Sequence, residues 1–155
     1  CYDERLRLLA FQMLGDAEQM NDALQDTFVK AYRALPEFRS EASLGTWLHS
    51  ICHRVCLDYL RQGKGAPELQ LIDEALPDPS DEPERLGLRE ELRSAIGALP
   101  VEQRIVLLLV DHEGYDYATV AGVLEVPVGT VASRLSLARS AVRARLRPAP
   151  CGEAR

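Results

Sequence analysis

The chain has 155 residues, of which 46% are hydrophobic, and it carries a net charge of −6. That length allows one ordinary domain or two small ones. No apolar run approaches the roughly 20 residues that a membrane-spanning helix needs, and the start CYDERLRLLAF lacks the layout of a secretory signal. We therefore expect a soluble, cytoplasmic protein. Cysteines at positions 1, 52, 56 and 151 lack the spacing of a disulfide framework, so we expect reduced thiols.

The negative charge is concentrated in the middle of the chain. Between Gly65 and Glu84 there are seven acidic residues and no basic one, whereas residues 132–147 hold five arginines and no acid. The isoelectric point of about 5.1 therefore reflects mostly the middle segment, and a basic element that can bind DNA remains available. Prolines and glycines in the same segment interrupt helices. The predicted division is a first domain (1–62), an acidic linker (63–84), a second domain (85–147) and a tail (148–155).

Apolar residues recur at helical spacing on both sides of the linker, and no alternating strand pattern extends beyond a few residues. The chain is therefore predicted to be all-α. In the first half we expect helices over Arg5–Leu14, Ala17–Leu35 and Leu44–Arg61, with Pro36 ending the second and Ser43 capping the third. The predicted buried stripes are Ala23, Leu24, Thr27, Phe28, Ala31 and Leu35 on the second helix, and Leu44, Trp47, Leu48, Ile51, Val55 and Tyr59 on the third.

The second half is predicted to hold four helices. They cover Arg85–Ala98, whose apolar side includes Leu88 and Leu92, then a stretch opened by Pro100 and closed by Gly114, then Tyr117–Leu124 capped by Asp116, and Val128 to about Leu146. The last pair has the layout of a helix-turn-helix, in which the second helix enters the major groove of DNA. The alternative is two packed helices with ordinary solvated arginines.

Histidines and cysteines gather on the third predicted helix, at His49, Cys52, His53 and Cys56. Side chains three and four positions apart share a helical face, and His and Cys are zinc ligands. One helix cannot surround a tetrahedral ion, and the sequence offers no second ligand cluster. We therefore interpret the two cysteines as small core residues and expect no metal or cofactor.

Three motifs carry a family resemblance: DALQDTF (22–28), FRSEASLGTWL (38–48) and VPVGTVASRL (126–135). In this order and spacing they resemble regions 2 and 4 of the extracytoplasmic-function (ECF) sigma factors of the sigma-70 family. The resemblance covers nearly the whole chain outside the linker. It implies an alternative sigma factor that binds core RNA polymerase, recognises minus-10 and minus-35 promoter DNA, initiates transcription in a stress response and is held inactive by an anti-sigma factor. It also implies that the family's first helix begins before Cys1.

The resemblance assigns three sets of site residues. Docking on the β′ subunit of the polymerase falls to Asp22, Gln25, Asp26, Phe28 and Lys30, with Phe28 as a core residue the alternative. Binding of the minus-10 element falls to Phe38, Arg39, Ser40, Ser43, Trp47 and Arg54, with Trp47 as a core residue the alternative. The family usually has basic residues at the positions of Ala132 and Leu137, so minus-35 binding rests here on Thr130, Ser133, Arg134, Ser136, Arg139 and Arg143. The alternative for Arg134 is a structural role, in which it braces the helix against its own domain.

Two further function classes stay open at this point. One is a helix-turn-helix regulator that does not dock on polymerase, and the other is a zinc enzyme or redox sensor built on the His/Cys face. The sequence shows no nucleophile, base and orienting group at a motif spacing and no phosphate-binding glycine loop, so we expect no enzymatic activity. For the acidic linker the resemblance implies a path through the polymerase, where it would imitate nucleic acid during initiation.

Overall fold

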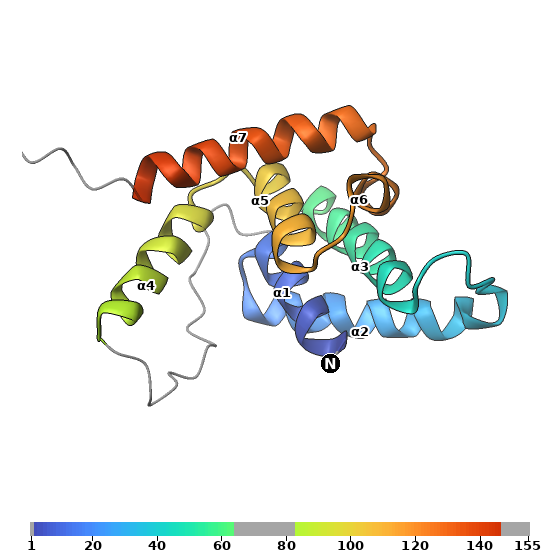
Figure 1. Ribbon diagram of the computed structural model, residues 1–155. Helices are drawn as coiled ribbons and strands as arrows, with labels where there is room; N and C mark the ends of the chain where they lie inside the picture. The colour runs from blue at the N-terminus through green and yellow to red at the C-terminus, as the bar shows by residue number, and fades with distance from the viewer. Residues whose placement is uncertain (1, 64–82, 147–155) are drawn as a thin grey trace, which may run out of the picture.

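The computed structural model describes residues 2–63 and 83–146, and every regular element in these two ranges is a helix (Figure 1). The expected all-α class is confirmed. Most of the predicted linker and the whole tail lie outside the described residues. The elements are α1 (Tyr2–Leu14), α2 (Ala17–Ala34), the 3₁₀ turn η1 (Leu35–Glu37), α3 (Leu44–Arg61), α4 (Pro83–Gly97), α5 (Val101–Leu107), the π turn η2 (Leu108–His112), α6 (Tyr117–Leu124) and α7 (Val128–Leu146).

Short polar side chains start three of these helices. Asp16, Ser43 and Asp116 lie in extended backbone directly before α2, α3 and α6. Each side chain accepts a hydrogen bond from the main-chain N–H three residues later, at 2.8, 3.1 and 2.7 Å. These bonds satisfy N–H groups that have no partner within the helix. The predicted caps Ser43 and Asp116 are thus confirmed.

The expected single helix after Pro100 is divided. Pro100 itself precedes the helix as its N-cap, α5 then runs to Leu107, and one π turn continues to His112. Gly114 ends this stretch with φ of +74°, a left-handed conformation that glycine adopts at little cost. The chain is thereby turned so that α6 can begin at Tyr117.

The two halves of the chain pack against one another. In the first half α1, α2 and α3 contact each other, and in the second half α7 lies across α4, α5 and α6 (Figure 1). α3 also contacts α6, and α1 contacts α5. One buried apolar cluster therefore runs through both halves, from Leu6 and Leu9 in α1 to Val120 and Leu135 in α6 and α7.

The buried face of α3 is wider than the apolar pattern predicts. Leu44 is 39% exposed, whereas Gly45, His49, Cys52 and Cys56 are buried. The reason is that α3 is covered by α1 and α2 on one side and by α6 on another. Gly45 and His49, which would face solvent if α3 packed on one side only, are therefore buried.

Besides Leu44, four large apolar side chains predicted to lie on buried faces are on the surface. Phe28 in α2 is 43% exposed and Leu35 after it is 50% exposed, because α2 is covered by the protein on one side only. In α4, Leu88 is 60% exposed and Leu92 is 39% exposed. α4 contacts α7 mainly through its C-terminal end, where Ala95 is buried.

No single described helix is both long and apolar enough to cross a membrane. α6 and α7 have the length and apolar composition of a membrane-spanning segment only when taken together, and the chain bends by 103° between them.

Candidate nucleic-acid interface

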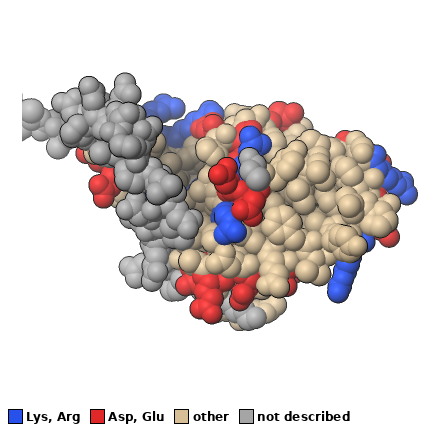
Figure 2. Space-filling model, turned by 90° about the horizontal axis from the view of Figure 1, so that it is seen from below, with Lys and Arg blue, Asp and Glu red and all other residues tan. Residues whose placement is uncertain are grey.

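The outer face of α2 carries the residues expected to dock on polymerase. Asp22, Gln25 and Asp26 are exposed at positions i, i+3 and i+4, so they share one face. Lys30 and the half-exposed Phe28 lie on the two flanks of this face. The side of the molecule on which α1 and α2 lie is mostly uncharged; one strip of acidic and basic side chains crosses it, and other charged side chains lie around its edge (Figure 2).

Two of these residues already have partners within the chain. The carboxylate of Asp26 accepts a hydrogen bond from the Tyr59 hydroxyl in α3 at 2.8 Å. Burial and this bond raise the pKa of Tyr59 to about 12, so the phenol stays a donor at every physiological pH. The ammonium of Lys30 lies 3.6 Å from the carboxylate of Asp58. Both contacts fix α2 against α3.

The sequence analysis missed two prominent residues of the same face. Val29 is 43% exposed and Tyr32 is 80% exposed. They follow Gln25 by four and seven positions, the spacing of one helical face, and that spacing was the signal that could have identified them. The exposed face of α2 therefore joins acidic and amide groups at its start to apolar and aromatic ones near its end.

Most of the expected minus-10 residues lie together before and at the start of α3. The rings of Phe38 and Trp47 pack with centroids 4.9 Å apart at an interplanar angle of 41°. Both rings are half-buried, and Trp47 also packs against the core, so each keeps part of its surface in solvent. Arg39 is exposed, and Ser40 has φ of 57° at the turn between them. Ser43 uses its hydroxyl as the cap of α3.

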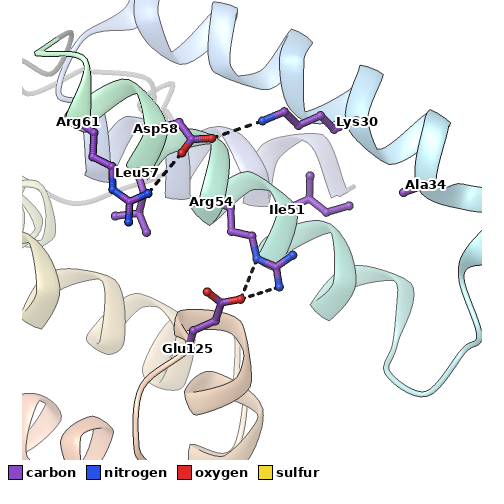
Figure 3. Close-up of a pocket in the computed structure, with 8 residues that line it drawn as sticks. All are labelled: Lys30, Ala34, Ile51, Arg54, Leu57, Asp58, Arg61 and Glu125. Carbon is purple, nitrogen blue, oxygen red and sulfur yellow. Dashed lines mark hydrogen bonds and ion pairs between the residues drawn. The ribbon is translucent and has the colours of Figure 1, made fainter.

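Arg54, the last of the expected minus-10 residues, lies about two turns beyond Trp47 along α3. It lines a groove of about 410 Å³ between α2, α3 and the turn of the helix-turn-helix, together with Lys30, Arg61, Asp58 and Glu125 (Figure 3). Its guanidinium contacts one oxygen of Glu125 through Nε at 3.0 Å and Nη2 at 2.8 Å. Arg54 therefore lies in this groove and not in the loop before α3, and its guanidinium is paired with the Glu125 carboxylate.

On α7, the residues expected to bind the minus-35 element divide into an outer face and two flanks. Ser133, Ser136 and Arg143 are exposed. Leu137, at 58%, and Ser140 are exposed beside them, and Ser140 was not among the expected contacts. Thr130, Arg134 and Arg139 are half-buried and lie toward the flanks, where the helix approaches its neighbours.

Arg139 is held by a bidentate contact with Asp111 at the end of η2. Nε and Nη2 of the guanidinium donate to the two carboxylate oxygens of Asp111, at 3.1 and 2.5 Å. This pair, with the Tyr117 side chain nearby, raises the pKa of Arg139. A small pocket of about 270 Å³ beside it is lined by Tyr117, Ser136, Ser140 and Arg143. The carboxylate of Asp111 thus fixes the direction of a guanidinium that is expected to bind the minus-35 element.

Buried polar groups join the two halves beneath these surfaces. Arg104 in α5 is 7% exposed and donates to the main-chain oxygens of Gln12, Gly97 and Leu99 at 2.8 to 2.9 Å. His49 is 1% exposed, and its Nδ1 lies 2.8 Å from the Gly45 oxygen and 3.1 Å from the Tyr115 hydroxyl. Arg104 and Tyr115, from the second half, therefore bond with groups of the first.

Burial changes the titration of the histidines and thiols on α3. Loss of water around the ring lowers the pKa of His49, and it lowers the pKa of His53 to about 4. The pKa of the Cys56 thiol is raised by the hydrogen bond between Cys56 and Cys52 and by the burial of Cys56, so this thiol stays protonated. No group of three or more potential metal ligands occurs within the described ranges. These facts favour the interpretation of Cys52 and Cys56 as core residues.

Comparisons with known proteins identify the family of the chain. Residues 1–65 match the family model described as Sigma-70 region 2, and residues 89–142 match the one described as Sigma-70, region 4. The RNA polymerase sigma-H factor of Pseudomonas aeruginosa is 34% identical, over 95% of this chain and 83% of its own length. The ECF RNA polymerase sigma factor SigM of Mycobacterium tuberculosis is 37% identical, over 90% and 70%.

Solved structures share the fold. The sigma factor RpoE of Bartonella quintana, in complex with the anti-sigma factor NepR, superposes with a TM-score of 0.70 at 21% identity, covering 91% of this chain and 89% of its own. CnrH, in complex with the cytosolic domain of CnrY, gives a TM-score of 0.64 at 26% identity, covering 94% and 82%. None of these names includes an enzymatic activity. On the identity and coverage of its relatives, the chain belongs to the ECF sigma factors of the sigma-70 family.

Proposed function

We propose that this sigma factor docks on core RNA polymerase through the outer face of α2 and recognises promoter DNA with two further surfaces. The loop 38–47 with α3 as far as Arg54 binds the minus-10 element, and the outer face of α7 binds the minus-35 element. It acts in the cytoplasm and performs no catalysis itself. The observation that carries the proposal is that three separate elements each leave a chemically suitable face uncovered.

The face of α2 suits a partner helix that carries basic residues. Asp22, Gln25 and Asp26 supply oxygen acceptors for arginine or lysine, and the exposed Val29 and Tyr32 supply apolar contact area next to them. Interfaces commonly have an apolar and aromatic centre with charged groups around it. The exposed docking face of α2 also favours a sigma factor over a regulator that only binds DNA, because such a regulator does not dock on polymerase.

The loop before α3 suits single-stranded DNA. The partly exposed rings of Phe38 and Trp47 give a surface on which a base can stack, and Arg39 is exposed close to them in the chain. Stacking of a base on an aromatic side chain contributes about 1–3 kcal/mol. Opening one step of a duplex costs about 1.4 kcal/mol on average, so one such contact offsets much of the cost of one step.

The outer face of α7 suits a major groove. Ser133, Ser136 and Ser140 provide short hydrogen-bonding side chains, Leu137 provides an apolar contact, and Arg143 provides a cation near the end of the helix. Serine pairs with more than one base edge, and an apolar side chain favours the methyl group of thymine. Sequence preference is therefore expected from the serines and Leu137, and phosphate contact from Arg143.

An anti-sigma factor is the expected regulatory partner. RpoE and CnrH, whose folds this chain shares, are described in complex with NepR and with the cytosolic domain of CnrY. A protein of that kind would have to cover at least one of the three uncovered faces to prevent transcription.

The docking face is tested by Asp26→Arg, with Tyr59→Phe as the matched control. Reversal of the charge should weaken binding to core polymerase about tenfold or more, equivalent to about 1.4 kcal/mol. Tyr59→Phe removes the 2.8 Å hydrogen bond but leaves the carboxylate on the surface, so polymerase affinity should stay unchanged. Affinity is measured with purified core polymerase, and helical content by circular dichroism.

The two variants separate docking from folding. If Tyr59→Phe lost as much affinity as Asp26→Arg, the carboxylate would act through α3 and not through polymerase. If Asp26→Arg kept full affinity, α2 would not be the docking helix. Transcription by core polymerase plus this chain on a promoter library then distinguishes a sigma factor, which initiates without another factor, from a regulator that does not dock.

A further inference from the structure

The turn between α6 and α7 contains a residue in an unfavourable backbone conformation. Glu125 has φ of 56° and ψ of 43°, in the left-handed region, and its N–H bonds to the Ala121 oxygen as the cap of α6. Glycine and asparagine adopt this conformation readily, whereas a side chain such as glutamate does so at a cost. Among the described residues only Ser40 and Glu125 have a positive φ without being glycine. Such residues are found where a side chain has a role that outweighs the strain.

The side chain of Glu125 reaches across to the other half of the protein. It contacts Arg54, which lies 71 positions earlier in α3. The packing of α6 on α3 brings the two together, and Figure 3 shows the Glu125 carboxylate facing the Arg54 guanidinium across the groove. A carboxylate of the half that holds α7 therefore engages a cation of the half that holds the minus-10 residues.

The other two cations in the groove have a different kind of partner. Lys30 and Arg61 each lie 3.6 Å from the carboxylate of Asp58, which belongs to the same half as they do. Only Arg54, of the three basic residues described as lining this groove, is paired by an acid from the second half. Its pairing therefore depends on how the two halves are packed.

The pair is also open to exchange. The side chains of Arg54 and Glu125 are 56% and 61% exposed, whereas Arg104 and His49, which link the halves elsewhere, are buried. An exposed ion pair is weak because water screens both charges, and dissolved salt weakens it further. A dissolved anion can thus replace Glu125 without disturbing the buried contacts.

We propose that Glu125 competes with DNA for Arg54. In the free protein its carboxylate occupies the guanidinium that would otherwise bind a phosphate of the minus-10 strand, and so lowers the affinity of the factor for single-stranded DNA. Carboxylate and phosphate oxygens accept the same hydrogen bonds from a guanidinium, so only one of them can hold it fully at a time. This inference rests on the proposed function, in which Arg54 contacts DNA.

The test is a double-mutant cycle on the full chain without polymerase. The dissociation constant of a labelled single-stranded DNA of random sequence is measured for wild type, Glu125→Gln, Arg54→Ala and the double variant at about 50 mM salt, where screening is moderate. Glu125→Gln should tighten binding up to about fivefold, the limit expected for release of an exposed pair. Arg54→Ala should weaken binding and should abolish the gain from Glu125→Gln.

Two further variants control for net charge and for folding. Glu102→Gln removes one negative charge at an exposed site in α5 of the same half, so it should change the affinity much less than Glu125→Gln. Glu125→Gly removes the carboxylate and also relieves the left-handed strain, so it should give the same gain in a protein at least as stable as wild type.

Three results would overturn the inference. The first is an unchanged affinity in Glu125→Gln, and the second is an equal gain in Glu102→Gln or in the Arg54→Ala background, which would indicate a general effect of charge. The third is an affinity that Arg54→Ala does not alter in either background. That third result would also remove Arg54 from the proposed minus-10 surface, whereas docking through α2 is judged separately by Asp26→Arg.

Discussion

Acidification should destabilise this protein through His53. The imidazole is 6% exposed on α3, and burial lowers its pKa to about 4, with Arg54 acting in the same direction and Glu125 opposing it. The unfolded chain binds a proton near the ordinary pKa of 6.5, whereas the folded chain resists protonation until about pH 4. Stability from His53 is therefore fully present above pH 6.5 and is lost as the pH falls toward 4.

The size of the effect follows from these two pKa values. At pH 5 the unfolded chain holds nearly one proton at this site, whereas the folded chain holds about a tenth of one. The corresponding loss in the free energy of unfolding is about 2 kcal/mol. His49, whose pKa burial also lowers, adds to the loss in the same direction.

Urea unfolding at pH 7 and pH 5 checks this prediction, with the fluorescence of Trp47, the one tryptophan of the chain, as the signal. Trp47 lies on the same helix as His53 and packs against the core, so it reports on unfolding of this half. His53→Leu should reduce the loss between pH 7 and pH 5 by about 2 kcal/mol. His112→Gln replaces an exposed histidine, so in this control most of the fall in the free energy of unfolding between pH 7 and pH 5 should remain. Equal pH dependence in wild type and His53→Leu would refute the reasoning.

Three other substitutions have defined expectations. Arg104→Met leaves the main-chain oxygen of Gln12 and two others without their buried donor, and should lower the free energy of unfolding by about 2–4 kcal/mol in a urea titration. Asp111→Asn frees the guanidinium of Arg139 for phosphate, and should tighten binding of minus-35 duplex DNA while steepening its salt dependence by about one. Ala132→Arg, half-buried beside Arg139, should tighten the same binding at low salt, and no gain at any ionic strength would show that this flank of α7 does not approach DNA.

Local signals in the sequence were enough to locate the helices. The caps Ser43 and Asp116, the stop before Pro36 and the glycine at 114 each act on backbone groups within a few residues. Their effect does not depend on the rest of the fold, so the predicted boundaries of α3 and α6 agree with the structure. Motifs at fixed spacing along the chain likewise identified the family, since each motif lies within one element and its approach.

Burial on each helix was predicted less well, because it depends on how many neighbours the helix has. Phe28 was placed on the apolar stripe of α2, but no described element covers that side, so the ring is exposed. His49 was not placed on the predicted buried stripe of α3, but α6 and α1 enclose its side of the helix, where the expected core residue Cys52 is also buried. An apolar pattern indicates that a helix has a buried face, but its width is set by the packing of other elements.

The partners of the candidate site residues were decided by the tertiary structure alone. Arg54 and Arg139 were both expected to face DNA freely, yet each is paired with an acid, Glu125 and Asp111, that lies 71 and 28 positions away. No periodicity or cap links residues at such separations, because they meet only when α6 packs on α3 and when Asp111 of η2 comes to lie beside Arg139 of α7. The sequence by itself determined which side chains are suited to bind polymerase and DNA, whereas the packing of the two halves determined which of them are already occupied within the protein.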